Sequence, residues 1–95
     1  MTDEDLQSLD ERTRRLHDHL AATAELAIDP RTNRWLGEAE AVARDAASTY
    51  LDVETTRKRV EQVERLLAEV DEIDTDEASE HVDAARCLCR KILAE

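Results

Sequence analysis

Residues 50–56 read YLDVETT, and this stretch decides how many helices the chain forms. Uncharged residues recur on both sides of it at alternating spacings of three and four, in a series that spans residues 39–70. Such spacing places the whole series along one stripe of an α-helix. The unbroken phase predicts one long helix over residues 34–73. The β-branched residues of the stretch, and Asp52 as a possible helix cap, favour the alternative of a break near Asp52.

Two further series flank this segment and predict a helix over residues 3–28 and another over residues 76–94. Pro30 separates the first from the middle helix, because the residue before a proline is pushed out of the α region. One Gly, one Pro and no Phe among 95 residues indicate an all-α fold in a single helical domain, residues 1–95. The repeating core positions, here called seam residues, are Leu6, Leu9, Thr13, Leu16, Leu20, Thr23 and Ala27, and then Ala78, Val82, Ala85, Cys89 and Ile92.

The lengths of the three predicted helices indicate how they pack. The first folds back along the first half of the middle helix and the last along its second half, so that each level holds two helices. Two helices cannot enclose a core, whereas two chains together supply four at each level. We therefore predict an antiparallel homodimer, with Trp35 as the anchor of an interface that also includes Tyr50, Val53, Val60 and Val63. A break near Asp52 would instead give a four-helix bundle from one chain.

The charge of the chain is strongly negative: 24 Asp and Glu face 13 Lys and Arg, for a net charge of −11. An acidic surface repels phosphate backbones, so nucleic acid is not an expected partner. No apolar run approaches the roughly 18 to 20 residues of a membrane helix, and the acidic N-terminus lacks the features of a secretory signal. A cytoplasmic location without a membrane is expected. The abundance of Asp and Glu with scarce Lys resembles the cytoplasmic proteins of halophilic archaea, which indicates a source and not an activity.

Four carboxylates could form a metal site across two predicted helices. Glu61 and Glu64 are three residues apart, as are Glu80 and Asp83, so each pair shares a helix face. This layout over residues 58–94 resembles the MazG-type all-α nucleotide pyrophosphohydrolases. The resemblance implies Mg²⁺ as the cofactor, held by these four side chains, and a nucleoside triphosphate as the substrate. Composition alone also produces such acidic pairs, so a solvated surface is the alternative.

Other residue types offer less chemistry. His17 and His19, like Cys87 and Cys89, are two residues apart and point to opposite sides of a helix, so we expect no metal role for either pair. No serine sits in a Gly-flanked turn of the kind that nucleophilic catalysis uses. If the last helix folds back, an anion or RNA contact becomes a further alternative through a basic band of Arg57, Lys58, Arg59, Arg86, Arg90 and Lys91.

These observations predict a small helical interaction or structural module. It is expected to form a homodimer, to work without a cofactor and to be no enzyme, with an unidentified protein as a second kind of partner. The Mg²⁺-dependent nucleotide hydrolase and the contact through the basic band remain its alternatives.

Overall fold

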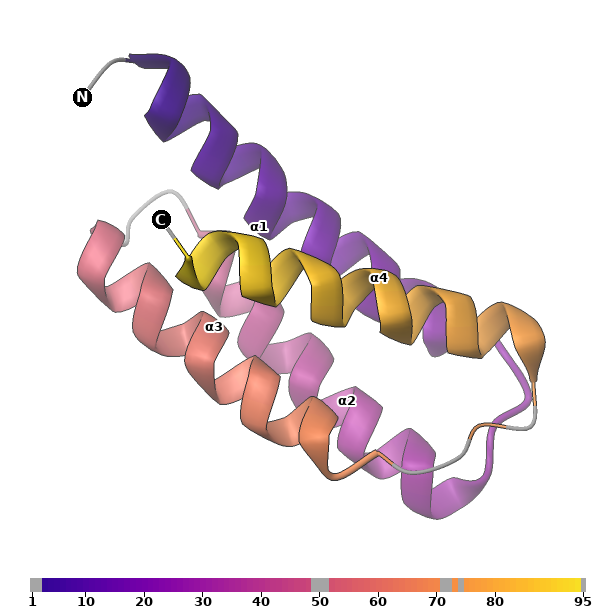
Figure 1. Cartoon of the computed structure of the whole chain (residues 1–95). Helices are drawn as coiled ribbons and strands as arrows, with labels where there is room; N and C mark the ends of the chain where they lie inside the picture. The colour runs from indigo at the N-terminus through magenta and orange to yellow at the C-terminus, as the bar shows by residue number, and fades with distance from the viewer. Residues whose placement is uncertain (1–2, 49–51, 71–72, 74, 95) are drawn as a thin grey trace.

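The computed structural model describes residues 3–48, 52–70, 73 and 75–94, with side chains from residue 9 onward. These residues form four α-helices: α1 (Asp3–Thr23), α2 (Pro30–Ala46), α3 (Val53–Ala68) and α4 (Asp76–Leu93) (Figure 1). No strand occurs within the described ranges, so the predicted all-α class is confirmed. None of these four helices combines the length and the apolar character that crossing a bilayer requires.

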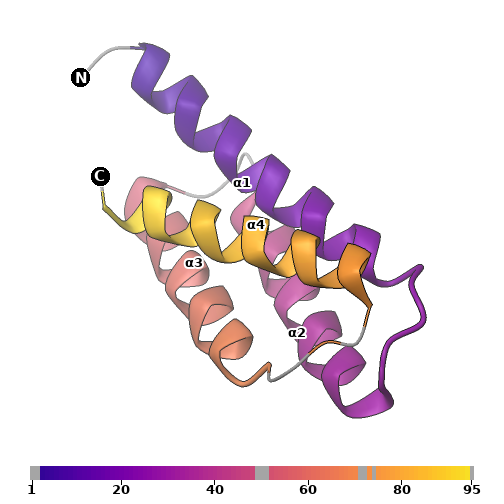
Figure 2. The same cartoon turned by 45° about the vertical axis from the view of Figure 1, so that its right-hand side comes forward.

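The four helices close into one bundle. Each runs antiparallel to the helix before it, and α4 packs back against α1 (Figures 1 and 2). The α1–α2 and α3–α4 connections lie at the same end, where the Thr75 hydroxyl donates a hydrogen bond to the carbonyl of Ala27 at 3.0 Å. At the opposite end, the N-terminal turns of α1 extend beyond the other helices (Figure 2).

Two helices stand where the sequence predicted one over residues 34–73. The α2 helix ends at Ala46 and α3 begins at Val53. Asp52 has an extended backbone, and its carboxylate accepts a hydrogen bond from the backbone N–H of Thr55 at 2.7 Å. This bond pairs an N–H that has no partner inside the new helix, and it lowers the pKa of Asp52. A bundle built from one chain, the alternative expected for a break near Asp52, is the architecture observed.

The other predicted boundaries need smaller corrections. The first helix ends at Thr23 and not at residue 28, and the last ends at Leu93. Asp29 caps α2 by accepting a hydrogen bond from the backbone N–H of Thr32 at 3.1 Å, with Pro30 in the first turn. Proline suits that position because its missing N–H would have had no helical partner.

The core is formed by most of the described seam residues, here including the uncharged series over residues 39–70, and these residues lie at the centre of the bundle. Three seam threonines are also buried, because each satisfies its hydroxyl on its own helix: Thr13 on Leu9 and Asp10, Thr23 on Leu20, and Thr56 on Asp52. No buried side-chain nitrogen or oxygen among the described residues lacks a hydrogen bond. The apolar side chains with at most 2% exposure are Leu16, Leu20, Leu36, Ala39, Ala43, Ala46, Val60, Val63, Leu67, Ala78, Val82, Ala85, Cys89 and Ile92.

Candidate functional site

The four carboxylates of the predicted magnesium site lie on the outside of the bundle. Glu61 and Glu64 are exposed on α3, and Glu80 and Asp83 are exposed on α4. Asp83 forms an ion pair with Arg86 on its own helix, with 3.7 Å between Oδ1 and Nη1. Within the described part of the chain, no three His, Cys, Asp or Glu side chains come together in a way that could hold a metal ion. The structure therefore does not assemble these carboxylates into a site.

Two arginines of the predicted basic band serve as links between helices. Arg57 on α3 donates hydrogen bonds to the carbonyls of Ile92 and Leu93 at 3.2 and 2.8 Å, at the end of α4. Arg86 on α4 donates to the carbonyls of Leu67 and Val70 at 2.9 and 3.0 Å, at the end of α3. Each guanidinium donates to carbonyls in the last turn of a helix or just beyond it, next to the negative end of the helix dipole.

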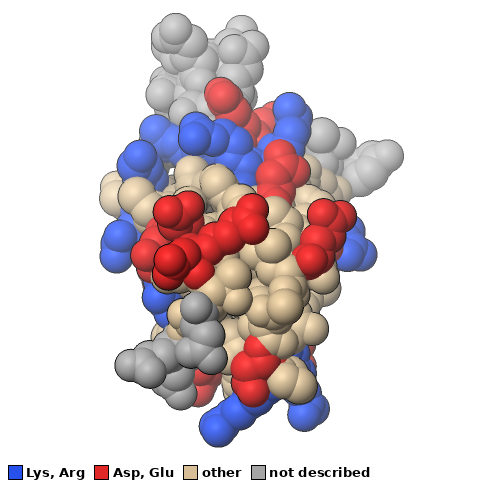
Figure 3. Space-filling model, turned by 90° about the vertical axis from the view of Figure 1, so that its right-hand side faces the viewer, with Lys and Arg blue, Asp and Glu red and all other residues tan. Residues whose placement is uncertain are grey.

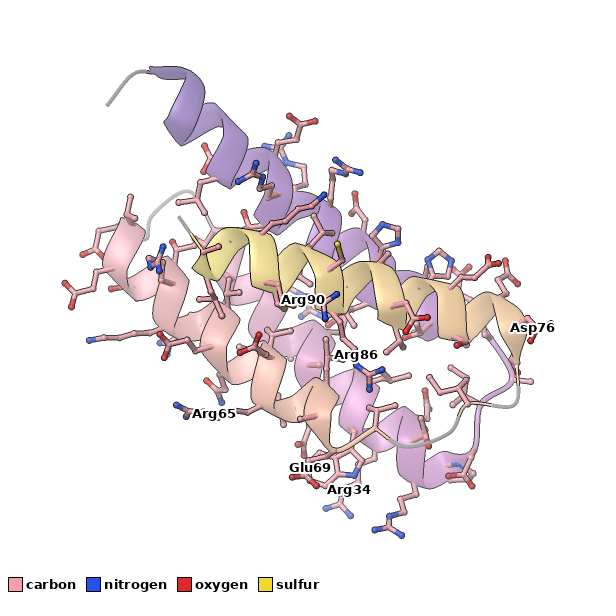
Figure 4. The ribbon with its side chains drawn as sticks, in the orientation of Figure 1. Arg34, Arg65, Glu69, Asp76, Arg86 and Arg90 are labelled. Carbon is pink, nitrogen blue, oxygen red and sulfur yellow. The ribbon has the colours of Figure 1, made fainter. Side chains whose placement is uncertain are left out.

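The members of the band differ in their contacts. Lys58 pairs with Glu54 at 3.6 Å on the surface of α3. Arg86 reaches from α4 toward the C-terminal end of α3 (Figure 4), whereas Arg57 acts at the opposite end of that helix. Arg86 thus acts near the opposite end of α3 from Arg57, whereas Arg57 lies at the end of α4 that carries Arg90 and Lys91.

The predicted interface residues also separate. Val60 and Val63 are 0% exposed and belong to the core of a single chain, so they offer no surface to a second chain. Trp35 is partly buried and packs against the same core. Val53 is 42% exposed at the start of α3. Tyr50 lies outside the described residues.

The two cysteines are free thiols on different sides of α4. Burial, followed by the nearby Glu64 carboxylate, raises the pKa of Cys89 to about 12, so this thiol stays protonated at neutral pH. Cys87 is half-buried and faces α1.

A histidine pair bridges α1 and α4. The Nδ1 atoms of His19 and His81 lie 3.0 Å apart, with 5.2 Å between the ring centroids. One ring must donate its proton to the other, because two bare nitrogens would repel at this distance. Burial, the His81 ring and Arg15 lower the pKa of His19, while Asp18 acts weakly against them.

The His19 pKa predicts how stability changes with pH. The folded value lies below the ordinary 6.5, so the unfolded chain takes up this proton first. The free energy of unfolding should therefore fall as the pH is lowered from about 7.5 to about 5.5. Urea unfolding across this range measures the decline, which should be smaller for His19→Gln. His17→Gln leaves the His19–His81 pair in place and should keep the decline. An equal decline in His19→Gln and the wild type would contradict the assignment.

Beside this pair lies an open pocket between α1 and α4, with a volume of about 460 Å³. The small Ala84 side chain and the half-buried Cys87 leave room between the helices, and Leu88 forms the apolar floor. The lining consists of Glu11, Arg12, Arg15 and His19 from α1, and Ala84, Cys87, Leu88 and Lys91 from α4. Three permanent cations therefore face one carboxylate, in a chain whose net charge is −11. This α1–α4 pocket is the candidate functional site.

Two of the three cations that line the pocket have no partner among the described residues. Arg15 and Lys91 are exposed, and neither forms a hydrogen bond or an ion pair with the rest of the described structure. Figure 3 views the end of the bundle that carries the two connections, where Lys and Arg cross the upper part, further Lys and Arg stand at the sides and the lower end, and most Asp and Glu lie between them. Cations without a partner beside a pocket are the arrangement expected where a negatively charged group is bound.

Comparison with known proteins adds a family but no activity. No curated protein and no solved structure matches the chain. One family model matches residues 12–95, a range that holds all of α2, α3 and α4 and every lining residue of the pocket except Glu11. The chain therefore belongs to the family described as Domain of unknown function (DUF8152).

Proposed function

We propose that this protein is a non-catalytic helical binding module whose contact surface is the α1–α4 pocket. The observation that carries the proposal is the set of cations facing this pocket, two of which have no partner within the described residues. Pockets with a few convergent polar groups over an apolar floor are the usual form of a binding site.

The roles of the other arginines support this choice. Arg57 and Arg86 are engaged at helix ends, where they hold α3 and α4 together. Arg44 pairs with Glu40 at 2.7 Å, and His17 reaches the same carboxylate at 3.4 Å. These contacts account for Arg44, Arg57 and Arg86 by packing alone. Arg15 and Lys91 differ from the other exposed cations that make no contact with the described residues, such as Arg14 and Arg90, because they line the pocket.

The homodimer predicted from the sequence would use the same helix contacts as this four-helix bundle. A dimer is expected where each chain supplies only two helices at each level, because two helices cannot enclose a core. One chain of this protein supplies all four helices, so it does not need a second chain to enclose its core. If α2 and α3 were continuous, α1–α2 of one chain would pack against α3–α4 of another with the same core contacts. The antiparallel dimer is therefore the domain-swapped form of the same bundle. We propose it as a second assembly of the module.

A blocked pocket tests the proposed contact surface. Ala84→Trp places a large side chain in the pocket, and Ala41→Trp places one on the exposed face of α2 as the matched control. Tagged chains would be used to capture partners from cells that make the protein. We expect at least one protein to be recovered with the wild type and Ala41→Trp but not with Ala84→Trp, and to show the same order of affinities once purified. Recovery of the same proteins by all three chains would contradict the proposal.

A further inference from the structure

The α1–α4 pocket has a charge pattern that specifies the chemistry of its ligand. Arg12 and Arg15 enter from α1 and Lys91 from α4, and the one carboxylate on the rim is Glu11. Arg15 and Lys91 stand on facing helices without a partner among the described residues, so an anion between them would be attracted by both. We propose that this pocket binds a phosphate-bearing small molecule, an inference that rests on the proposed function of the pocket as the contact surface.

Two cations without a partner among the described residues, Arg15 and Lys91, favour phosphate over a single carboxylate. A phosphate monoester carries close to two negative charges at neutral pH and three strong acceptor oxygens. Guanidinium groups bind such oxygens through paired N–H donors, and the Lys91 ammonium adds a point charge from the opposite wall. His19 supplies a further nitrogen on the same side as Arg15.

The rest of the lining indicates an organic body on the ligand. Leu88 is 6% exposed and forms the floor, and Ala84 and Cys87 leave the space above it open. A volume of about 460 Å³ exceeds what a bare phosphate fills and lies within the range of small-molecule sites. An apolar group attached to the phosphate would contact the partly exposed Ala84 and Cys87 and add affinity by removing their apolar surface from water.

The acidic surface outside the pocket favours a small ligand over a nucleic acid. Screening reduces the influence of distant charges beyond about 8 Å at physiological ionic strength. A small anion inside the pocket is therefore governed by the cations around it. A polynucleotide would have to run onward over a surface that is negative on balance, where its phosphates are repelled.

The test is a titration of the ¹⁵N-labelled protein followed by amide chemical shifts, with inorganic phosphate, phenyl phosphate and benzoate as probes. Phenyl phosphate should bind most tightly, and its saturable shifts should be confined to the amides of α1 and α4. Arg15→Gln and Lys91→Gln should each weaken it about tenfold, since each removes one charge-assisted contact. Arg14→Gln is the matched control: this exposed residue on α1 does not line the pocket, and its loss should change the affinity less than about twofold.

Three results would overturn the inference: no saturable shift with phenyl phosphate, equal weakening by Arg14→Gln and Arg15→Gln, or benzoate binding as tightly as phenyl phosphate. The far-ultraviolet circular dichroism of each variant shows that the bundle is intact. A result that rejects the phosphate ligand can be distinguished from a result that rejects the pocket as the contact surface. A partner protein lost only with Ala84→Trp, in a chain that binds no phenyl phosphate, would keep the contact surface and reject the phosphate ligand.

Discussion

A chain in which Asp52, Val53 and Thr55 are all replaced by alanine should have close to twice the 10.8 kDa molar mass of one wild-type chain. Asp52 caps α3 through the Thr55 backbone N–H at 2.7 Å, and the alanine removes this acceptor. The two β-branched residues disfavour helix slightly, and alanine favours it most. The three substitutions together therefore favour a continuous helix from α2 into α3.

A continuous helix cannot fold back on itself, so the two halves of the chain must find their contacts in a second chain. The seam keeps its phase through the stretch, because Ala46, Val53 and Val60 stand seven residues apart. The fused helix would still present one apolar stripe, and the core contacts would be the same between chains as within one. Domain swapping is expected when the same core can form within one chain or between two chains, and only the conformation of the hinge differs between these two forms.

Light scattering after size exclusion measures the outcome. Val53→Ala alone keeps the Asp52 cap and should have the mass of the wild-type chain. A triple variant that stays at the mass of one chain, with its helical circular dichroism intact, would show that the cap does not decide the assembly. A wild-type chain that already has the dimer mass would support the homodimer predicted from the sequence.

The hairpin and the continuous helix share one apolar pattern, and this explains which features of the fold the sequence predicts correctly. The spacing of Leu16, Leu20, Val60 and Leu67 predicts correctly which faces are apolar, and all four are buried. Periodicity reports which side of a helix is covered, but not which helix covers it. A hairpin and a continuous helix satisfy the same pattern, and we expect the cap at Asp52 to decide between them. A single local hydrogen bond of this kind leaves the phase of the pattern unchanged.

The candidate site could not be predicted without knowing which helix packs against which. The sequence paired the first helix with the start of the middle one and the last helix with its end, so that the first and last helices never met within one chain. His19 and His81 each precede a seam residue by one position, Leu20 and Val82. Once α1 and α4 are known to pair antiparallel, this offset places both rings on the same side of the helix pair. Histidines 62 positions apart carry no such signal by spacing alone.

Charge patterns have a related limit, which Arg86 illustrates. The sequence groups it with other basic residues as a possible anion contact. In the structure, its guanidinium donates to the carbonyls of Leu67 and Val70, and backbone carbonyls leave no trace in a pattern of side-chain types. A cation that ties two helices together and a cation that is free to bind a ligand look the same in a sequence.

Arg86→Met should therefore lower the free energy of unfolding by about 2 kcal/mol, the cost expected for losing hydrogen bonds that involve a charged group. Methionine keeps an apolar stem of similar length, so the loss reports mainly the two bonds to the end of α3. Val70 is 5% exposed, and its carbonyl has little water to replace the guanidinium. Urea unfolding followed by circular dichroism measures the change.

Arg90→Met is the matched control, because Arg90 is exposed on the same helix and makes no hydrogen bond or ion pair with the described residues. Its effect should stay within about 0.5 kcal/mol. Arg86→Lys keeps the charge near the end of α3 but cannot reach both carbonyls with one planar fork, so it should restore only part of the loss. Equal destabilisation by Arg86→Met and Arg90→Met would mean that the chain responds to the lost positive charge as such. The hydrogen bonds from Arg86 to the end of α3 would then add nothing to the free energy of unfolding beyond the effect of the charge.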